Sequence, residues 1–275
     1  MKKGLFKKVV AGVLISVFAL GLVSCANKDE KAAEKASAVD RIKKAGKLVL
    51  GTSADYPPYE FHKSVNGKDT IIGFDIEIAR EIAKSLGVEL EISDMKFDGL
   101  LAALKTGKVD MIISGMNPTE ERKKSVDFSK VYYNANQFVV VRAEDKDKVK
   151  SLVDLNGKKI GVQKATVQES LAKDQIKDAQ LKSLGKIPDI VLELRNKKVD
   201  AAVIEGPVAK FYTDKNKDLV ITDAAFSVKE DEKGSAIAIQ KGSDDFLKIV
   251  NDTLDRLIKE GKIEKFVIEA TNQVE

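Results

Sequence analysis

Two stretches of this chain read Leu104-Lys-Thr-Gly-Lys-Val-Asp110-Met-Ile-Ile-Ser114-Gly115 and Leu194-Arg-Asn-Lys-Lys-Val-Asp200-Ala-Ala-Val-Ile-Glu205-Gly206. Each is predicted to be the end of a helix, a basic turn and a short apolar strand that finishes in a polar residue and glycine. The duplication favours two similar lobes. A chance likeness between two common helix-to-strand turns is the alternative.

The sequence around the two copies alternates between strand and helix patterns. Apolar residues at helical spacing predict a helix over 74–86, with Gly87 as its C-cap, and a second, short helix over 97–104. Strands are predicted at 48–52, 88–92, 109–113 and 159–162. This alternation favours an α/β fold with a largely parallel sheet. Because ligands bind at the carboxyl ends of strands in open α/β sheets, two lobes predict a shared cleft.

The first 25 residues have the pattern of an export signal. Lys2, Lys3, Lys7 and Lys8 precede an apolar run, Val9–Val23, and the small residue Ser24 precedes Cys25. The run is shorter than the ~20 residues that span a bilayer. Leu-Val-Ser-Cys resembles the bacterial lipobox, which implies cleavage before Cys25 and lipid on that residue. A lone buried cysteine in an uncleaved anchor is the alternative.

Charge and cysteine content exclude several classes of protein. Removing residues 1–24 removes four lysines and no acidic residue, which leaves 43 basic residues against 43 acidic ones. A neutral, mixed surface gives no electrostatic reason to expect nucleic-acid binding. Cys25 is the only cysteine, so the fold must be held by its core without disulfides. The remaining chain of about 250 residues is long enough to bury such a core.

The sequence predicts neither a metal nor a cofactor. It contains one histidine, His62, and no Cys/His cluster, phosphate-binding loop or nucleophile elbow. A Ser/His pair that uses His62 remains open. We expect His62 to be a solvated loop residue that leads into a polar turn at Asn66-Gly67.

The segment Ser114 to Arg122 is a candidate anion site. Asn117 is predicted to cap a helix that starts at Pro118, and Glu120 completes a capping box. A helix N-terminus beside a strand end suits an anion, and Gly115 permits close approach of a ligand. Arg122, one turn later, offers a planar fork to a carboxylate. Spacing alone also fits a capped surface helix with a solvated arginine.

Other candidate residues follow strand ends in both halves of the chain. Thr166 is predicted to cap a helix in a Thr-x-x-Glu box, and its hydroxyl offers a second contact to the same anion. Glu205 suits an ammonium group, although one more solvated glutamate is the alternative. The Asp55-Tyr-Pro-Pro-Tyr59 loop carries two aromatic rings that suit a ligand side chain. Phe97 either faces them or belongs to the core.

Taken together, these pieces resemble the polar-amino-acid solute-binding proteins of ABC importers over about residues 40–270. The resemblance rests on Gly51-Thr52-x-x-x-Tyr56-x-Pro58-Tyr59-Glu60, Gly73-Phe74-Asp75-Ile76, Ser114 to Arg122, Val126-Asp127-Phe128-Ser129, Gly161-Val162-Gln163 with Thr166, and Asp200-Ala201-Ala202. It implies a type II periplasmic-binding-protein-like fold of two Rossmann-like lobes that close on an amino acid.

The resemblance also implies roles for the site residues. Those expected to hold the α-carboxylate are Arg122, Ser114, Gly115, Asn117 and Thr166. Glu205 is expected to meet the α-ammonium, while Tyr56 and Phe97 stack on the ligand side chain. Several relatives have aspartate at Ser53 and glycine at Ala165, so the side-chain preference stays open. Asp55 and Glu60 suit arginine or lysine, whereas Gln163 and Ser53 suit glutamine.

We therefore expect a monomeric lipoprotein that delivers an amino acid to a membrane permease and makes or breaks no bond. Residues 25–39 are expected to form a flexible tether, residues 40–133 and 229–275 one lobe, and residues 134–228 the other. The hinge strands are expected near 133–140 and 228–236. The alternatives are a dehydratase-like enzyme on the same fold, with Glu205 as proton donor, and a surface adhesin or sensor.

Overall fold

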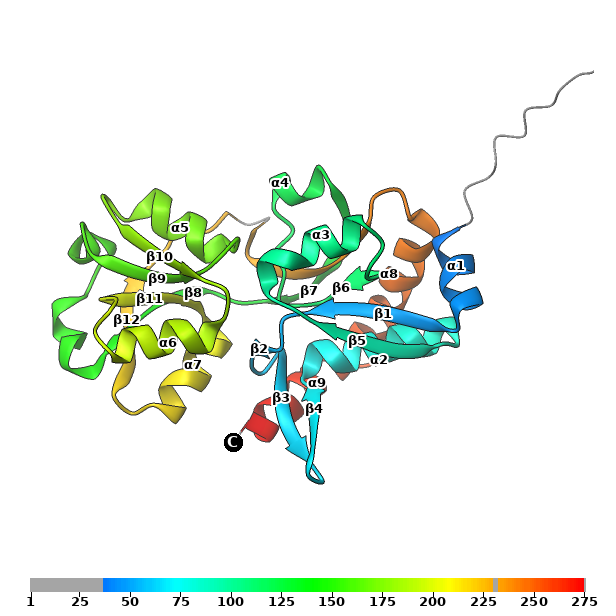
Figure 1. Ribbon diagram of the computed structural model, residues 1–275, viewed down its shortest axis with the longest axis horizontal. Helices are drawn as coiled ribbons and strands as arrows, with labels where there is room; N and C mark the ends of the chain where they lie inside the picture. Colours follow the sequence, from blue (N-terminus) through cyan, green and yellow to red (C-terminus); the bar gives the residue numbers. More distant parts are fainter. Residues whose placement is uncertain (1–36, 230–231, 275) are drawn as a thin grey trace, which may run out of the picture. The chain divides into compact units, whose positions relative to one another are not determined.

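A computed structural model describes residues 37–229 and 232–274 of the protein. The described chain is built around two five-stranded sheets, which Figure 1 shows as separate groups of strands joined by the segment between β7 and β8. The signal sequence and Cys25 lie outside the described residues, as does most of the expected tether. That tether is predicted too long at its C-terminal end, because Ser37 caps a helix, α1, that begins at Ala38.

The first sheet has the strand order β5-β1-β6-β13-β7. Its strands are β1 (Lys47–Thr52), β5 (Glu89–Asp94), β6 (Met111–Ile112), β7 (Val126–Asn134) and β13 (Gly234–Gln240). Strands β5, β1 and β6 are parallel, whereas β13 is antiparallel to both of its neighbours. The helical elements of this lobe are α1 (Ala38–Ala45), α2 (Phe74–Leu86), η1 (Phe97–Gly99), α3 (Leu100–Lys105), α4 (Glu120–Lys123), α8 (Asp244–Lys259) and α9 (Lys262–Val274).

The second sheet has the strand order β10-β9-β11-β8-β12. Its strands are β8 (Gln137–Arg142), β9 (Lys159–Gln163), β10 (Gln180–Leu184), β11 (Ala201–Glu205) and β12 (Leu219–Ala225). Strands β10, β9 and β11 are parallel, and β8 is antiparallel to β11 and β12. The helical elements are η2 (Ala143–Lys148), η3 (Leu152–Leu155), α5 (Val167–Gln175), α6 (Ile187–Arg195) and α7 (Gly206–Lys215).

We call the elements from α1 to β7, together with those from β13 to α9, the first lobe, and the elements from β8 to β12 the second lobe. The chain crosses between the two lobes twice. In each sheet, the first strand after a crossing, β8 or β13, is antiparallel and lies beside the three parallel strands. The crossings lie between Asn134 and Gln137 and between Ala225 and Gly234, and they are neighbours, because Asn134 pairs with Gly234. This arrangement confirms the predicted α/β fold class.

The two copies of the repeated unit make the same contacts. Asp110 accepts a hydrogen bond from the backbone N–H of Val49 in β1 (2.9 Å), and Asp200 accepts one from Lys159 in β9 (2.9 Å). The backbone N–H of each aspartate also donates to the carbonyl of the same residue. Each aspartate thus fixes the middle one of the three parallel strands in its own sheet, so the repeat reflects similar structure.

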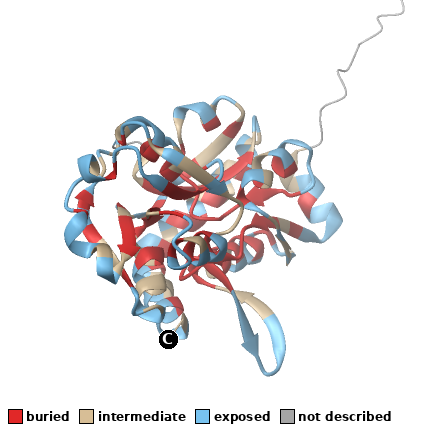
Figure 2. Ribbon diagram, turned by 60° about the vertical axis from the view of Figure 1, so that its left-hand side comes forward, coloured by how far each residue is buried: buried red, intermediate tan, exposed pale blue. Residues whose placement is uncertain are grey.

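Each sheet is covered on both faces because its side chains alternate. In the first sheet, Ile112 and Ala238 pack with Leu100 of α3, whereas Ile113 and Ile237 face the cluster that contains α2 and α8. The apolar residues whose spacing predicts a helix over 74–86 are Phe74, Ile78, Ile82 and Leu86, and all four are buried. Gly87 ends that helix with a left-handed φ of 72°. Figure 2 shows buried residues concentrated along the strands and the inner faces of the helices.

A third, smaller sheet is formed by β2 (Asp55–Tyr56), β3 (Glu60–Val65) and β4 (Lys68–Ile72). The predicted turn at Asn66-Gly67 joins β3 to β4, and both residues have positive φ. The placement of His62 in a loop is wrong, because it lies within β3, where it contacts Asp69 and Asp94. Of the other predicted elements, 97–104 divides into η1 and α3, and the 109–113 strand shortens to β6.

Candidate functional site

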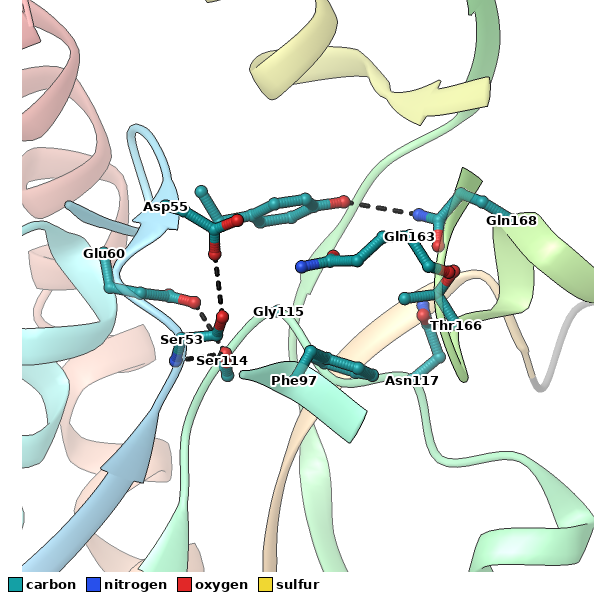
Figure 3. A pocket seen from close by; sticks show the side chains of 11 residues that line it. Ser53, Asp55, Glu60, Phe97, Ser114, Gly115, Asn117, Gln163, Thr166 and Gln168 are labelled. Atoms are coloured by element: carbon teal, nitrogen blue, oxygen red, sulfur yellow. Dashed lines mark hydrogen bonds between the residues drawn. The ribbon is translucent and has the colours of Figure 1, made fainter. Parts of the chain in front are cut away.

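The carboxyl ends of the central strands carry polar side chains that meet in one cavity. Its lining residues are Ser53, Asp55, Tyr56, Glu60, Phe97, Ser114, Gly115, Asn117, Gln163, Thr166 and Gln168. In Figure 3, Asp55, Glu60 and Ser114 of the first lobe lie on one side, and Gln163, Thr166 and Gln168 of the second lobe lie on the other. The accessible space is about 10 Å³, roughly what one water molecule needs. A ligand larger than water would fit only if the lobes moved apart.

The first-lobe wall is a chain of hydrogen bonds. The hydroxyl of Ser114 donates to Oε1 of Glu60 (2.7 Å) and accepts from the backbone N–H of Ser53 (3.1 Å). The hydroxyl of Ser53 donates to Oδ1 of Asp55 (2.7 Å). These bonds fix the side chains before any ligand is bound, which lowers the entropy lost on binding.

The second-lobe wall is ordered by amide side chains. Nε2 of Gln168 donates to Oε1 of Gln137 (2.8 Å) and to the hydroxyl of Tyr56 (3.3 Å). Sequence reasoning missed Gln168, although its place in the first turn after Thr166 puts it beside the same strand end. Thr166 caps α5, as predicted. The predicted box is incomplete, because Glu169 accepts from the N–H of Ala165 rather than that of Thr166.

The helix that carries Arg122 starts later than predicted. Thr119 is the N-cap of α4 and accepts from the N–H of Arg122, so the assignment of the cap to Asn117 is wrong. The physical reason is tertiary, because the amide of Asn117 donates to the carbonyl of Gly234 (3.1 Å), where the chain returns from the second lobe. Pro118 precedes the cap, outside the helix.

Arg122 is buried, with 8% of its surface exposed, so it is not the solvated surface arginine that its spacing allowed. Its guanidinium donates to the carbonyls of Asn117 (2.7 Å) and of Ala165 across the cleft (2.8 Å). It also lies 5.3 Å from the centre of the Phe97 ring. Burial lowers the pKa of Arg122 to about 10, so the side chain remains a cation at neutral pH. It lines a neighbouring cavity of about 500 Å³ with Thr166.

Glu205, at the end of β11, is also buried rather than solvated, and 1% of its surface is exposed. Its Oε2 accepts from the hydroxyl of Tyr56 (3.0 Å), whereas Oε1 has no partner. Burial raises the pKa of Glu205 to about 8, and the hydroxyl of Tyr56 opposes this shift. Tyr56 therefore connects Glu205 of the second lobe to the aromatic side chains of the first lobe, where it packs on Tyr59.

Behind the cavity, Glu60 and Asp75 form a buried pair of carboxyl groups. Asp75 accepts from the N–H of Gly115 (2.9 Å) and the hydroxyl of Tyr132 (2.9 Å), and one oxygen of each carboxyl has no partner. Burial raises the pKa of Glu60, and the neighbouring Asp75 raises it further. Burial also raises the pKa of Asp75. Two adjacent carboxyls in such surroundings are expected to share one proton.

The two loop aromatics have different positions. Tyr56 lines the cavity, but Tyr59 is fully buried and packs on Phe74 (4.4 Å between ring centres) and Tyr133 (5.6 Å). The hypothesis that both rings face a ligand is therefore wrong for Tyr59. Phe97 lines the cavity and also belongs to a core cluster with Leu100.

The site therefore has a large excess of buried acid. Asp55, Glu60, Asp75 and Glu205 are all buried, and within the described residues none of them forms a salt bridge. Among the described residues the buried basic side chain is Arg122, and it forms no salt bridge with any of these acids. Buried carboxyls are normally paired with a cation or kept neutral. Because these carboxyls have no cation of their own, the arrangement suits a positively charged ligand.

Two further features of the described chain concern metal binding and membrane insertion. No three or more His, Cys, Asp or Glu side chains in residues 37–229 and 232–274 are grouped so that they could hold a metal ion. None of the helices in that same part of the chain has the length and apolar character needed to span a membrane.

Two lobes with a small polar cavity between them define a ligand-binding protein of the two-lobe α/β class. The model of the bacterial extracellular solute-binding proteins, family 3, matches residues 48–269, and the chain belongs to this family. The description of the family indicates that its members act outside the cytoplasm.

Named relatives agree with this assignment. The chain is 39% identical to the arginine-binding extracellular protein ArtP of Bacillus subtilis, over 96% of each chain. It is 35% identical to a probable histidine-binding protein of Campylobacter jejuni, over 93% of this chain and 95% of the relative. An amino acid ABC transporter substrate-binding protein from Streptococcus pneumoniae, solved with L-arginine bound, has 40% identity and a TM-score of 0.83, with 86% of this chain and 98% of the other covered.

Proposed function

We propose that this protein captures a cationic amino acid, with arginine the first candidate, and delivers it to the permease of an ABC importer without changing it chemically. The excess of buried acid carries the proposal: four buried carboxyls and no salt bridge to any of them among the described residues. An amino acid zwitterion brings one positive and one negative group. A basic side chain adds the second positive charge that this cavity favours.

We assign the α-carboxylate to the wall beside Arg122. The guanidinium now donates to the carbonyls of Asn117 and Ala165, and its two-pronged geometry matches a carboxylate better than it matches two separate carbonyls. Ser114, Gly115, Asn117 and Thr166 line the cavity between the lobes, and Thr166 also lines the neighbouring cavity that contains Arg122. A ligand carboxylate would replace the bond to Ala165 and so keep both lobes connected through Arg122.

We assign the positive groups of the ligand to the acids. Glu205 has a carboxyl oxygen without a partner for the α-ammonium, and so has Glu60, whose other oxygen accepts from the hydroxyl of Ser114. Tyr56 and Phe97 offer aromatic faces, which attract a planar guanidinium through cation–π contact. Of the three relatives named above, one is an arginine-binding protein, one was solved with L-arginine bound and one is a probable histidine-binding protein, which supports a basic ligand.

Glutamine is the rival ligand, because Gln163 and Ser53 suit an amide and both line the cavity. Calorimetric titration with arginine, lysine, histidine and glutamine distinguishes the two. We expect arginine to bind tightest and glutamine to bind at least about tenfold more weakly, a difference of about 1.4 kcal/mol. Tighter binding of glutamine would overturn the cationic assignment, and the absence of binding by all four would overturn the proposed function.

We further propose that residues 40–133 with 229–275, and residues 134–228, move as two rigid bodies that close on the ligand. Each body contains its own sheet, and the paired crossings at Asn134 and Gly234 provide a short hinge. The Streptococcus pneumoniae relative, which covers 86% of this chain, supports a shared two-lobed form. Small-angle scattering with and without the bound amino acid tests the closure.

The membrane anchor remains a proposal that rests on the sequence. We propose that cleavage before Cys25 and lipid on Cys25 tether the protein to the outer face of the cell membrane, as a monomer. Replacing Cys25 with serine is expected to release the protein into the soluble fraction. If wild-type protein and Cys25→Ser partition identically on cell fractionation, the anchor proposal is wrong.

An enzymatic role has one observation in its favour. Glu205 is a buried acid whose pKa is raised to about 8, which is a property of catalytic proton donors. An ammonium partner accounts for the same burial. Recovery of each bound amino acid unchanged after long incubation, measured by mass spectrometry, supports the binding function, whereas loss of the amino acid or its α-ammonium would support the enzyme.

A further inference from the structure

Helix α6 of the second lobe has no N-terminal cap of its own. Its N-cap residue is Lys186, whose side chain makes no capping hydrogen bond, and Pro188 stands in the first turn. Lysine cannot accept a hydrogen bond, so it cannot satisfy the free N–H groups there. The backbone N–H of Ile187 instead donates to Oδ2 of Asp55 at 2.7 Å, in a buried contact that joins residues 132 positions apart.

Asp55 belongs to the first lobe, so this contact crosses the cleft. We propose that Asp55 caps helix α6 from the opposite lobe, so that the cap exists only when the lobes are closed and Asp55 sets how readily the cleft closes. The inference rests on the proposed binding function, since it gives Asp55 a role in closure rather than in recognising the charge of the ligand side chain.

The surroundings of Asp55 support this role. Its second carboxyl oxygen accepts from the hydroxyl of Ser53 (2.7 Å), so both oxygens already have neutral donors. Its backbone carbonyl accepts from the hydroxyl of Tyr212 on α7 (3.2 Å), a second bond across the cleft. Beside it, Lys186 lies 3.6 Å from Asp94 of the first lobe. The start of α6 thus contacts the first lobe through both its backbone and its side chain.

Opening exposes both partners of the cap to water, so the bias toward closure is modest. Deleting an N-cap side chain weakens a helix by an amount equivalent to a change of about 2- to 30-fold in an equilibrium constant. Because ligand binding requires closure, a weaker cap lowers the apparent affinity for every ligand by the same factor.

The decisive experiment compares Asp55→Asn with Asp55→Ala. Asparagine is as good a cap as aspartate but has no charge, whereas alanine cannot cap. We expect Asp55→Ala to weaken calorimetric binding about 2- to 30-fold for arginine and for any neutral amino acid that binds. Asp55→Asn, which can still cap α6, should lose less affinity than Asp55→Ala for each of these ligands. Equal damage by both variants, confined to cationic ligands, would show that Asp55 recognises ligand charge and would overturn the inference.

A double-mutant cycle provides a second test. Lys186 has the extended φ and ψ of an N-cap (−136° and 143°), so Lys186→Ser should give α6 a cap within its own lobe. In that background, Asp55→Ala should have a markedly smaller effect. An unchanged effect would overturn the inference. Asp98→Ala, which removes an exposed ion pair to Lys164 across the cleft, is the control and should change affinity less than twofold.

The closed fraction of the ligand-free protein separates this inference from the proposed function. Dyes placed on the two lobes report closure by energy transfer without any amino acid present. We expect Asp55→Ala to reduce the closed fraction and Asp55→Asn to preserve it, even if no amino acid binds. If both variants close like the wild type, Asp55 is not a cap that controls closure.

Discussion

The two lobes share a scaffold but differ in the charged side chain that each buries after its third parallel strand. In both, an aspartate of the repeated unit fixes the middle parallel strand, and a glycine in that strand lies against a valine, Gly51 against Val109 and Gly161 against Val199. They diverge after the third parallel strand. In the first lobe a loop leads to α4 and Arg122, whereas in the second α7 begins at once after Glu205.

Under the proposed function, this difference turns a duplicated framework into a site for a zwitterion. Arg122 would provide a cation from the first lobe, and Glu205 would provide a buried carboxyl from the second that ionises when an ammonium group lies against it. An amino acid bound between them would contact a group of opposite charge in each lobe, and these contacts would stabilise the closed state. A ligand can shift the lobes toward the closed state only through such contacts, which are absent when the lobes are apart.

The largest effect should come from removing the cation of the first lobe. Arg122→Ala is expected to weaken binding of every recognised amino acid by about 2–5 kcal/mol, because the carboxylate loses its buried partner. Arg122→Lys should restore only part of the affinity, since an ammonium lacks the planar fork. Calorimetry on folded variants measures both.

The second lobe offers a matched control in Arg142. This half-buried arginine donates to the carbonyls of Leu194 and Val199 and contacts Asp145, and it lines a different cavity, together with Lys158 and Asp200. Arg142→Ala should lower the free energy of unfolding by about 1–3 kcal/mol, because it leaves those carbonyls unsatisfied, and should leave affinity nearly unchanged. If Arg122→Ala behaves in the same way, its role is structural and the carboxylate assignment fails.

Next in size is the loss of the second-lobe anion. Glu205→Gln is expected to weaken binding by about 2–5 kcal/mol, because the α-ammonium loses its charged partner while the hydrogen bond from Tyr56 can persist. Thermal unfolding should show an intact fold. Unchanged affinity in calorimetry would remove Glu205 from the site.

The Glu205→Gln variant also tests how stability and affinity depend on pH. The pKa of Glu205 is raised to about 8 in the folded protein, above the ~4.3 expected for an unfolded glutamate. Stability from this group is therefore complete below the unfolded pKa and falls as pH rises toward 8. A cationic ligand prefers the ionised carboxylate, so affinity should increase with pH over this range. Glu205→Gln should make both the stability and the affinity less dependent on pH. If either pH dependence is unchanged in the variant, it arises from another group.

A smaller effect should distinguish the two aspartates of the repeat. Asp110→Asn weakens the hydrogen bond from the backbone of β1, and Asp200→Asn weakens the one from the backbone of β9. Each is expected to lower the free energy of unfolding by about 1–2 kcal/mol. Asp110 also pairs with Arg41 and is more buried than Asp200, so its replacement should cost more. Denaturant unfolding gives both values. Equal costs would mean that the pair with Arg41 contributes little.

The smallest effect concerns the strained position in the second lobe. Ala165 has φ of 63°, a conformation that disfavours residues with a Cβ. Ala165→Gly removes this strain but increases the flexibility of the unfolded chain, so we expect a gain of at most about 1 kcal/mol. Unfolding measurements that show a loss would mean that the Cβ packs favourably. The bond from Arg122 to the Ala165 carbonyl should persist.

Local patterns predicted the fold well because their causes are local. The helix at 74–86 follows from apolar spacing and a glycine C-cap, and both are visible in sequence. The site was harder to predict. Asn117 and Thr119 are both good caps, and the choice depends on a bond from Asn117 to Gly234, far along the chain.

Buried acids were the least predictable part of the site. In a chain that is 33% charged, Asp75 looks like any solvated aspartate, and its burial depends on Gly115 and Tyr132. Asp55 was noticed, but its bond to Ile187 joins two lobes and leaves no local pattern. Gln168 was missed because one glutamine in a helix has no signature of its own.

The strand orders have a consequence for the order of assembly during synthesis. The second sheet uses only residues 137–225, so it can form as soon as that segment has been made. The first sheet cannot form completely at that stage, because β13 fills the place between β6 and β7 and comes from residues 234–240. The lobe that begins first along the chain is therefore completed last, and until then β6 and β7 each present an unpaired edge.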